Sequence, residues 1–337
     1  RSCLTAPDAV PSAHSKRAPA GDPIMTVSLG NQDRPADLEA AILDLKREKG
    51  AVILAHFYQE SEVQDLADIV GDSLALARAA QEIDCKMIVF CGVHFMAETA
   101  AILNPGIPVV VPDMDAGCSL ADGCPPEEFK AFVADHPGAK VLTYINASAG
   151  VKAMSDLICT SSNAVKMVEH FEGEKLIFAP DRHLARWVAK ETGRDDLIVW
   201  QGACIVHELF SAKGLAKLRA QHPDAEVLAH PECDQAVLDQ ADFISSTTGI
   251  ISRAVASPDR PSIIATEDGV FHSIMKQAPG KVLYQAPGMD ESCVCNRCPY
   301  MRLNTLEKLY DCLANEGPCV TVPEELAKQA LLPIEKM

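Results

Sequence analysis

Three apolar runs in this chain each end in residues that could transfer a proton or bind an anion. The three pairs are His56 with Tyr58, Tyr144 with Asn146, and His230 with Glu232. Imidazole, phenol and carboxyl groups are the usual general acids and bases of enzymes. We therefore interpret all three pairs as candidate substrate contacts. His56, Tyr58, Tyr144, His230 and Glu232 are also candidate catalytic residues, and Glu232 either orients His230 or removes a carbon-bound proton itself.

A hydroxyl residue follows each of these runs at the same distance. Ser73, Ser161 and Thr247 lie seventeen residues after His56, Tyr144 and His230, and the three copies start 88 and then 86 residues apart. Such periodicity indicates three related units whose polar residues converge on one site. Each hydroxyl precedes a helical stretch, so it is predicted to cap that helix, to bind an anion at its N-terminus, or both.

The chain contains thirteen cysteines, an odd number. Cys293, Cys295 and Cys298 lie close together, and the last precedes a proline, as in some iron–sulfur motifs. They do not complete a cluster or zinc motif locally, so distant cysteines must contribute to any such site. Other candidates are Cys91 and Cys204, which follow predicted strands, and the loop pair Cys118 and Cys124.

Both strands and helices must position these residues. Short, almost continuously apolar strands, as at 51–57, 141–146 and 226–231, alternate with helical patterns such as 37–50 and 184–193. This alternation is typical of parallel sheets covered by helices on both faces. In such sheets ligands bind beyond the carboxyl ends of the strands, where the candidate residues lie. We expect an α/β fold of three homologous three-layer (αβα) domains with short parallel sheets, related by pseudo-three-fold symmetry around a central active site.

The domain boundaries follow from the repeat. We predict a flexible, proline-containing extension over residues 1–35, a first domain over 36–128, a second over 129–213 and a third, with C-terminal helices, over 214–337. Gly50 and Gly193 are predicted to end helices.

Composition excludes several classes of protein. The formal charge is −17, and nucleic acid binding would need a basic surface. No apolar run reaches the ~18 residues of a membrane span. No secretory signal is evident, and cysteine-rich disulfide frameworks belong to small secreted domains. We therefore expect a cytoplasmic protein with reduced thiols that binds neither membranes nor nucleic acid. We also expect it to be a monomer or a homodimer.

Ten motifs, in order, carry a family resemblance. They are AHFYQ, GDSLALARAA, FCGVHFMAETA, YINASAGVKAMSDLICTSSNA, FAPDRHLA, WQGACIVHE, AHPEC, SSTTGI, TEDGVFHSI and CPYMRLNTLEKLY. Together they resemble quinolinate synthase, an enzyme of NAD biosynthesis, over about residues 36–313.

The resemblance implies a condensation of iminoaspartate with dihydroxyacetone phosphate that gives quinolinate, phosphate and water. It also implies a [4Fe–4S] cluster held by one cysteine from each domain, which motif matching places at Cys91, Cys204 and Cys298. The open iron of that cluster would act as a Lewis acid. L-aspartate oxidase or aspartate dehydrogenase would supply the iminoaspartate. The Cys293-x-Cys295-x2-Cys298 spacing departs from the Cys-x2-Cys-x2-Cys of some members, and the roles of Cys293, Cys295, Cys118 and Cys124 stay open.

Two other classes remain as alternatives. An aconitase-like hydro-lyase would use the same open iron on a single substrate without releasing phosphate. A non-enzymatic cluster or zinc sensor would need no constellation of His, Tyr and Glu facing the metal.

Overall fold

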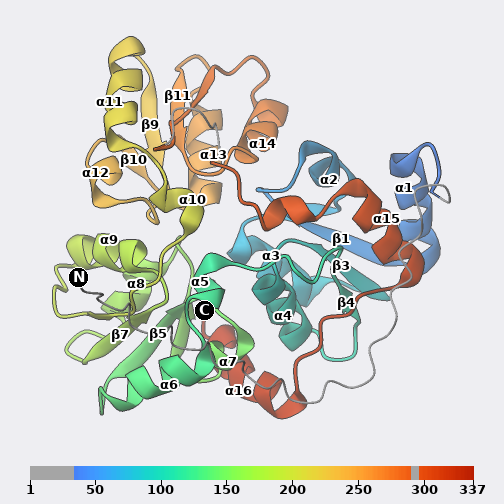
Figure 1. The fold of residues 1–337 in the computed structure, drawn as a ribbon, viewed down its shortest axis with the longest axis horizontal. Helices are drawn as coiled ribbons and strands as arrows, with labels where there is room; N and C mark the ends of the chain where they lie inside the picture. The colour runs from blue at the N-terminus through green and yellow to red at the C-terminus, as the bar shows by residue number, and fades with distance from the viewer. Residues whose placement is uncertain (1–33, 290–295) are drawn as a thin grey trace, which may run out of the picture.

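The computed structural model describes residues 34–289 and 296–337 of the 337-residue chain. The described residues form three lobes, each built on one four-stranded sheet (Figure 1). All strand pairs in these sheets are parallel. This confirms the α/β fold with three short parallel sheets flanked by helices. Among the described residues, none of the helices has the length and apolar character needed to cross a bilayer.

The first lobe contains the sheet of order β2-β1-β3-β4. Its elements are α1 (Leu38–Lys49), β1 (Ala51–His56), α2 (Ser61–Leu66), β2 (Ile69–Gly71), α3 (Ser73–Glu82), β3 (Met87–Cys91), α4 (His94–Leu103) and β4 (Val109–Val110), and α5 (Ser119–Asp122) leads to the next lobe. The predicted helix stop at Gly50 is confirmed, because Gly50 adopts a φ of 62° at the C-cap of α1. Such left-handed backbone favours glycine.

The second lobe has the sheet order β6-β5-β7-β8. Its elements are α6 (Pro126–Ala134), β5 (Lys140–Tyr144), α7 (Ala149–Lys152), β6 (Leu157–Cys159), α8 (Ala164–Glu169), β7 (Leu176–Ala179), α9 (Arg182–Thr192) and β8 (Ile198–Val199), followed by α10 (Ile205–Glu208).

The third lobe has the sheet order β10-β9-β11-β12. Its elements are α11 (Ala212–Gln221), β9 (Glu226–Ala229), α12 (Gln235–Leu238), β10 (Phe243–Ile244), α13 (Thr247–Ala256), β11 (Ser262–Ala265), α14 (Val270–Gln277) and β12 (Leu283–Gln285). The predicted boundaries near residues 128 and 213 fall within the first turns of α6 and α11.

The repeat seen in the sequence is also a repeat of topology. In each lobe the first strand lies between the second and the third, with the fourth at the edge. In each lobe, one residue of the first strand donates its backbone N–H to the side chain of an aspartate fifteen residues later. The aspartates are Asp68, Asp156 and Asp242, and the N···O distances are 2.8–2.9 Å. The same side chain therefore fixes the same crossover three times.

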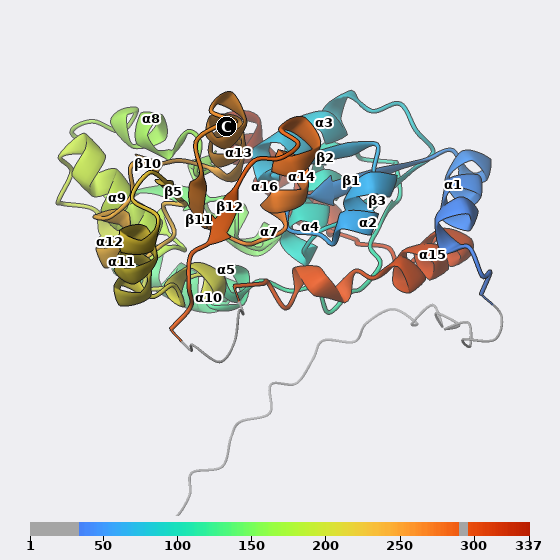
Figure 2. The same ribbon diagram turned by 90° about the horizontal axis from the view of Figure 1, so that it is seen from above.

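The C-terminal segment leaves the third lobe and packs on the other two. The turn η1 (Met301–Leu303) is followed by α15 (Leu306–Asn315), which lies against α1 of the first lobe (Figures 1 and 2). The last helix, α16 (Glu324–Glu335), packs against α4 of the first lobe and α7 of the second. Apolar side chains of α16 thus join the core that the first two lobes share.

Candidate active site

One cavity lies where the three lobes meet, and it encloses about 720 Å³, counting the part that opens to solvent. Its wall includes residues at the carboxyl ends of the first strand in every lobe: His56 ends β1, Tyr144 ends β5, and His230 follows β9. Parallel strands carry their ligand sites at this end.

Eleven of the twelve predicted site residues line this cavity. They are His56, Tyr58, Ser73, Tyr144, Asn146, Ser161, Cys204, His230, Glu232, Thr247 and Cys298. Residues more than 240 positions apart in the sequence, such as His56 and Cys298, therefore share one wall. Their roles in binding and catalysis remain predictions.

Cys91 is the exception, and its placement corrects the expectation that it meets Cys204 and Cys298. Side chains alternate between the two faces of a strand. Phe90 of β3 points to one face, whereas Cys91 points to the other, where it packs with Cys312 of α15. Cys91 is fully buried in that apolar cluster and does not line the cavity.

Cys118 lines the cavity instead, beside Cys204 and Cys298. Cys118 immediately precedes the short helix α5, and Cys204 immediately precedes the short helix α10. The two cysteines are 86 residues apart, close to the offset of 88 between His56 and Tyr144. The period of the repeat was therefore a signal that could have identified Cys118, whereas Cys91 and Cys204 are 113 residues apart.

The three thiols are close enough to influence one another. Burial raises the pKa of Cys118 to about 12 and that of Cys298 to about 11, and it also raises the pKa of Cys204. Repulsion from the other two thiolates contributes to the raised pKa of Cys204. All three are free cysteines, so a cation among them would find three thiolate donors. Cys293 and Cys295 lie outside the described residues.

Glu232 is the centre of the polar wall. Its Oε1 accepts a 2.6 Å hydrogen bond from the Tyr144 hydroxyl, and its Oε2 lies 2.8 Å from Nδ1 of His207. Burial by itself would raise the pKa of Glu232, but His230, His207 and these hydrogen bonds outweigh it and lower that pKa. Glu232 is therefore a buried, ionised carboxylate that accepts hydrogen bonds from its neighbours.

His56 and His230 have the same local geometry. Nδ1 of His56 accepts a hydrogen bond from the backbone N–H of Tyr58 at 3.1 Å, and Nδ1 of His230 accepts one from that of Glu232 at 3.4 Å. Burial lowers the pKa of His56 to about 4 and that of His230 to about 3, so both imidazoles are neutral at pH 7. A neutral imidazole that accepts at Nδ1 carries its proton on Nε2. The Nε2–H group of each histidine is therefore available as a donor. Nε2 of His230 lies 3.2 Å from the Ser161 hydroxyl oxygen.

The Tyr58 hydroxyl connects two lobes. It lies 3.0 Å from the Thr247 hydroxyl and 2.7 Å from that of Thr266. Burial raises the pKa of Tyr58 and of Tyr144 well above the ordinary value, so both phenols keep their protons. The sequence predicts no role for His207 or Thr266, yet His207 Nε2 lies 2.8 Å from Thr266 Oγ1.

The hydroxyl residues line the cavity but do not cap their helices. The N-caps of α3 and α13 are Asp72 and Ser246, whose side chains accept from Ala75 and Gly249. Ser73 and Thr247 are the first residues inside those helices. The N-cap of α8 is Asn163, two residues after Ser161. The capping part of the prediction is therefore wrong for all three hydroxyl residues.

Asn146 has an unpaired polar atom. Its Oδ1 is buried and has no hydrogen-bond partner among the described residues. Buried polar groups are normally hydrogen-bonded, so this oxygen can accept a hydrogen bond from a molecule in the cavity.

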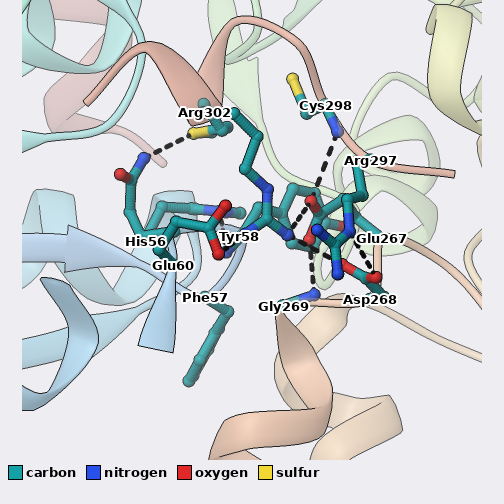
Figure 3. A network of polar contacts seen from close by, with 12 residues as sticks. His56, Phe57, Tyr58, Glu60, Glu267, Asp268, Gly269, Arg297, Cys298 and Arg302 are labelled. Atoms are coloured by element: carbon teal, nitrogen blue, oxygen red, sulfur yellow. Dashed lines mark hydrogen bonds and ion pairs between the residues drawn. The ribbon is translucent and has the colours of Figure 1, made fainter. Parts of the chain in front are cut away.

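A buried ionic network holds the Cys298 turn (Figure 3). The Glu267 carboxylate accepts hydrogen bonds from the N–H of Gly269 at 2.7 Å, from the N–H of Cys298 at 3.3 Å and from Arg302 at 2.7 Å. Arg302 also pairs with Asp268 of the third lobe and Glu60 of the first. Arg302 therefore ties the Cys298 turn to two lobes at once.

Comparison with known proteins gives consistent matches. The family model described as quinolinate synthetase A protein matches residues 40–337. The quinolinate synthase of Synechococcus sp. is 56% identical over 306 residues, which cover 90% of this chain and 95% of that protein. The quinolinate synthases of Nostoc punctiforme and Chloroherpeton thalassium are each 55% identical, over 90% and 89% of this chain and 93% and 94% of their own lengths.

Proposed function

Because this chain belongs to the quinolinate synthetase A family, we propose that it condenses iminoaspartate with dihydroxyacetone phosphate to give quinolinate, phosphate and two waters. The single observation that carries this proposal is the convergence of three free cysteines and a His, Tyr and Glu constellation on one cavity between three lobes. A metal sensor would have no need of the acid–base groups in that wall.

The proposed cluster ligands are Cys118, Cys204 and Cys298. The donor set fits a [4Fe–4S] cluster, because the three thiols are close together, partly buried and free of disulfides. A cluster bound there would supply one iron without a protein ligand, which can serve as a Lewis acid. This set replaces the one that motif matching gave, in which Cys91 took the place of Cys118.

The remaining wall would bind and orient the substrate anions. Nε2–H groups of His56 and His230 are donors held by backbone contacts, so they need little reorganisation to bind a carboxylate or phosphate oxygen. Ser73 and Thr247 add hydroxyls at the first turns of α3 and α13, where helix N-termini favour negative charge. Ser161 and the amide of Asn146 complete this set. These donors account for anion binding by a chain of charge −17.

Proton transfer would use the same wall. Glu232 is the ionised acceptor, so we assign it the removal of a carbon-bound proton from the condensing substrate. Tyr58 and Tyr144 are protonated hydroxyls that can donate to a departing oxygen. Because His230 and Glu232 are almost fully buried, that part of the wall would restrict water while the reactive imine is held.

The substrate chemistry also implies a supplier. Iminoaspartate hydrolyses readily in water, so an L-aspartate oxidase or aspartate dehydrogenase in the same compartment, which we take to be the cytoplasm, would have to produce it.

Anaerobic reconstitution with iron and sulfide tests this proposal directly. The protein should then form quinolinate from the two substrates, and Cys118→Ser, Cys204→Ser and Cys298→Ser should each lose the cluster's visible absorption and its activity. Cys91→Ser is the matched control and should keep both. A full cluster in Cys118→Ser, or its loss in Cys91→Ser, would refute the ligand assignment.

A further inference from the structure

Cys204, His207 and Glu232 form a group of metal-ligating side chains that differs from the three cysteines. One donor atom from each residue lies within 4.8 Å of the other two. Nδ1 of His207 is the shared neighbour, 3.2 Å from Cys204 Sγ and 2.8 Å from Glu232 Oε2. His207 and Glu232 are almost fully buried, and all three line the cavity.

The spacing of these donors is close to that around a tetrahedral ion. Zinc binds sulfur at about 2.3 Å and nitrogen or oxygen at about 2.0–2.2 Å, which sets neighbouring donors roughly 3.3–3.6 Å apart. The observed 3.2 and 2.8 Å are hydrogen-bonding distances, slightly shorter. An ion that replaces the shared proton would need Nδ1 of His207 to move away from each of the other two donors by only a few tenths of an ångström.

Groups behind two of the donors already orient them. His207 Nε2 lies 2.8 Å from Thr266 Oγ1, and the second oxygen of Glu232 is held by the Tyr144 hydroxyl at 2.6 Å. The His207 ring also stacks on His230, with 4.7 Å between centroids. Metal-binding histidines and carboxylates are usually fixed in this way, through the atom that does not bind the metal.

We propose that, when the cluster is absent, Cys204, His207 and Glu232 bind one zinc-type divalent ion, with a water of the cavity as fourth ligand. Thiolate, imidazole and carboxylate together favour zinc, cobalt or ferrous ions over magnesium or calcium. Three protein ligands and one open position are the arrangement of catalytic zinc sites. Binding releases the Cys204 thiol proton to solvent. The proton that Nδ1 of His207 shares with Glu232 moves to Nε2, where Thr266 Oγ1 lies 2.8 Å away, so His207 binds the ion as a neutral imidazole.

The inference rests on the proposed function in one respect: Cys204 would be a ligand of both the iron–sulfur cluster and the zinc ion. The ion and the cluster are therefore mutually exclusive, and zinc bound to the cluster-free protein would block cluster assembly. The other ligands differ, since the cluster set needs Cys118 and Cys298 and the zinc set needs His207 and Glu232.

Metal titration of the cluster-free, reduced full-length protein tests the inference. Zinc affinity is measured by competition with a chromophoric chelator, and cobalt provides the thiolate-to-metal absorption band. The unmodified chain should bind one tight equivalent. Thr266→Val should weaken it about 10–100-fold, and His207→Ala and Glu232→Gln should weaken it more. The cobalt band should disappear in Cys204→Ser.

Cys118→Ser and Cys298→Ser are the matched controls, and both should keep the tight equivalent although they lose the cluster. Circular dichroism checks that each variant is folded, and Thr266→Val keeps the test available if Glu232→Gln unfolds. The inference is overturned if the chain binds no tight zinc, if His207→Ala binds it unchanged, or if the cysteine controls lose it. Failure of the cluster assignment would appear separately, as a full cluster in Cys118→Ser.

Discussion

Removing the positive charge of Arg302 should weaken both the fold and the metal site. Its guanidinium pairs with Glu267, whose side chain is 0% exposed, and with Asp268 and Glu60. In Arg302→Met the Glu267 carboxylate keeps two backbone N–H donors but loses its buried counter-charge. Breaking a buried pair from one side costs about 3–5 kcal/mol.

The neighbouring Arg297 provides a control on the same loop. It pairs with Asp268 alone among the described contacts and its side chain is 57% exposed, so Arg297→Met should cost at most about 1 kcal/mol. Glu267→Gln keeps an oxygen acceptor for Gly269 and Cys298 and should cost about 2 kcal/mol. The double variant Arg302→Met/Glu267→Gln removes both charges of the pair. Its loss of stability should therefore be about 2 kcal/mol smaller than the sum of the losses in the two single variants.

Urea unfolding measures these differences in stability. We choose pH 8 because burial raises the pKa of Glu267 only to about 7, so the carboxylate is ionised at that pH. Iron content after reconstitution reports on the Cys298 turn and should fall in Arg302→Met but not in Arg297→Met. If Arg302→Met is no less stable than Arg297→Met, or if the two effects add, the network does not hold this turn.

Three further predictions concern single side chains. Tyr58→Phe should fold and bind the cluster but lower turnover by ~10²–10⁴-fold, and an unchanged turnover number would show that the ring only packs. Ser73→Ala should raise the KM for an anionic substrate without the ~1 kcal/mol loss of a capping substitution, since Ser73 is not the N-cap; a thermal melt and a KM measurement decide this. Burial lowers the pKa of Lys152 from 10.5 to about 8, so the unfolded chain binds more protons between these values and stability rises with pH across that window. That pKa change corresponds to about 3 kcal/mol, and the loss of the Lys152 hydrogen bonds to Phe95 and Thr99 offsets about 1 kcal/mol of it. Lys152→Met should therefore stabilise the protein by about 2 kcal/mol at pH 7 and by progressively less as pH rises through that window, and an equal gain at pH 7 and pH 10 would contradict the burial argument.

The sequence by itself determined the fold class and most of the cavity wall. Near-continuous apolar strands and the seventeen-residue spacing are local features of the chain, and they predicted three parallel α/β units. Polar residues after the first strands, such as His56 and His230, were predicted to bind ligands because ligand sites of parallel sheets lie beyond the carboxyl ends of their strands. Gly50 was found for a similarly local reason, the left-handed backbone at a helix end.

Tertiary structure alone decided which face of β3 carries Cys91 and which residues stand behind the proposed catalytic groups. Cys91 and Phe90 are adjacent in the sequence, and only the packing of α15 over one face of β3 shows that Cys91 points away. His207 and Thr266 carry no local signal, since their 2.8 Å contact joins the segment after the second sheet to the end of a strand in the third. Such contacts depend on how whole lobes dock, and the free energy of docking comes from side chains distant in sequence, which local patterns do not encode.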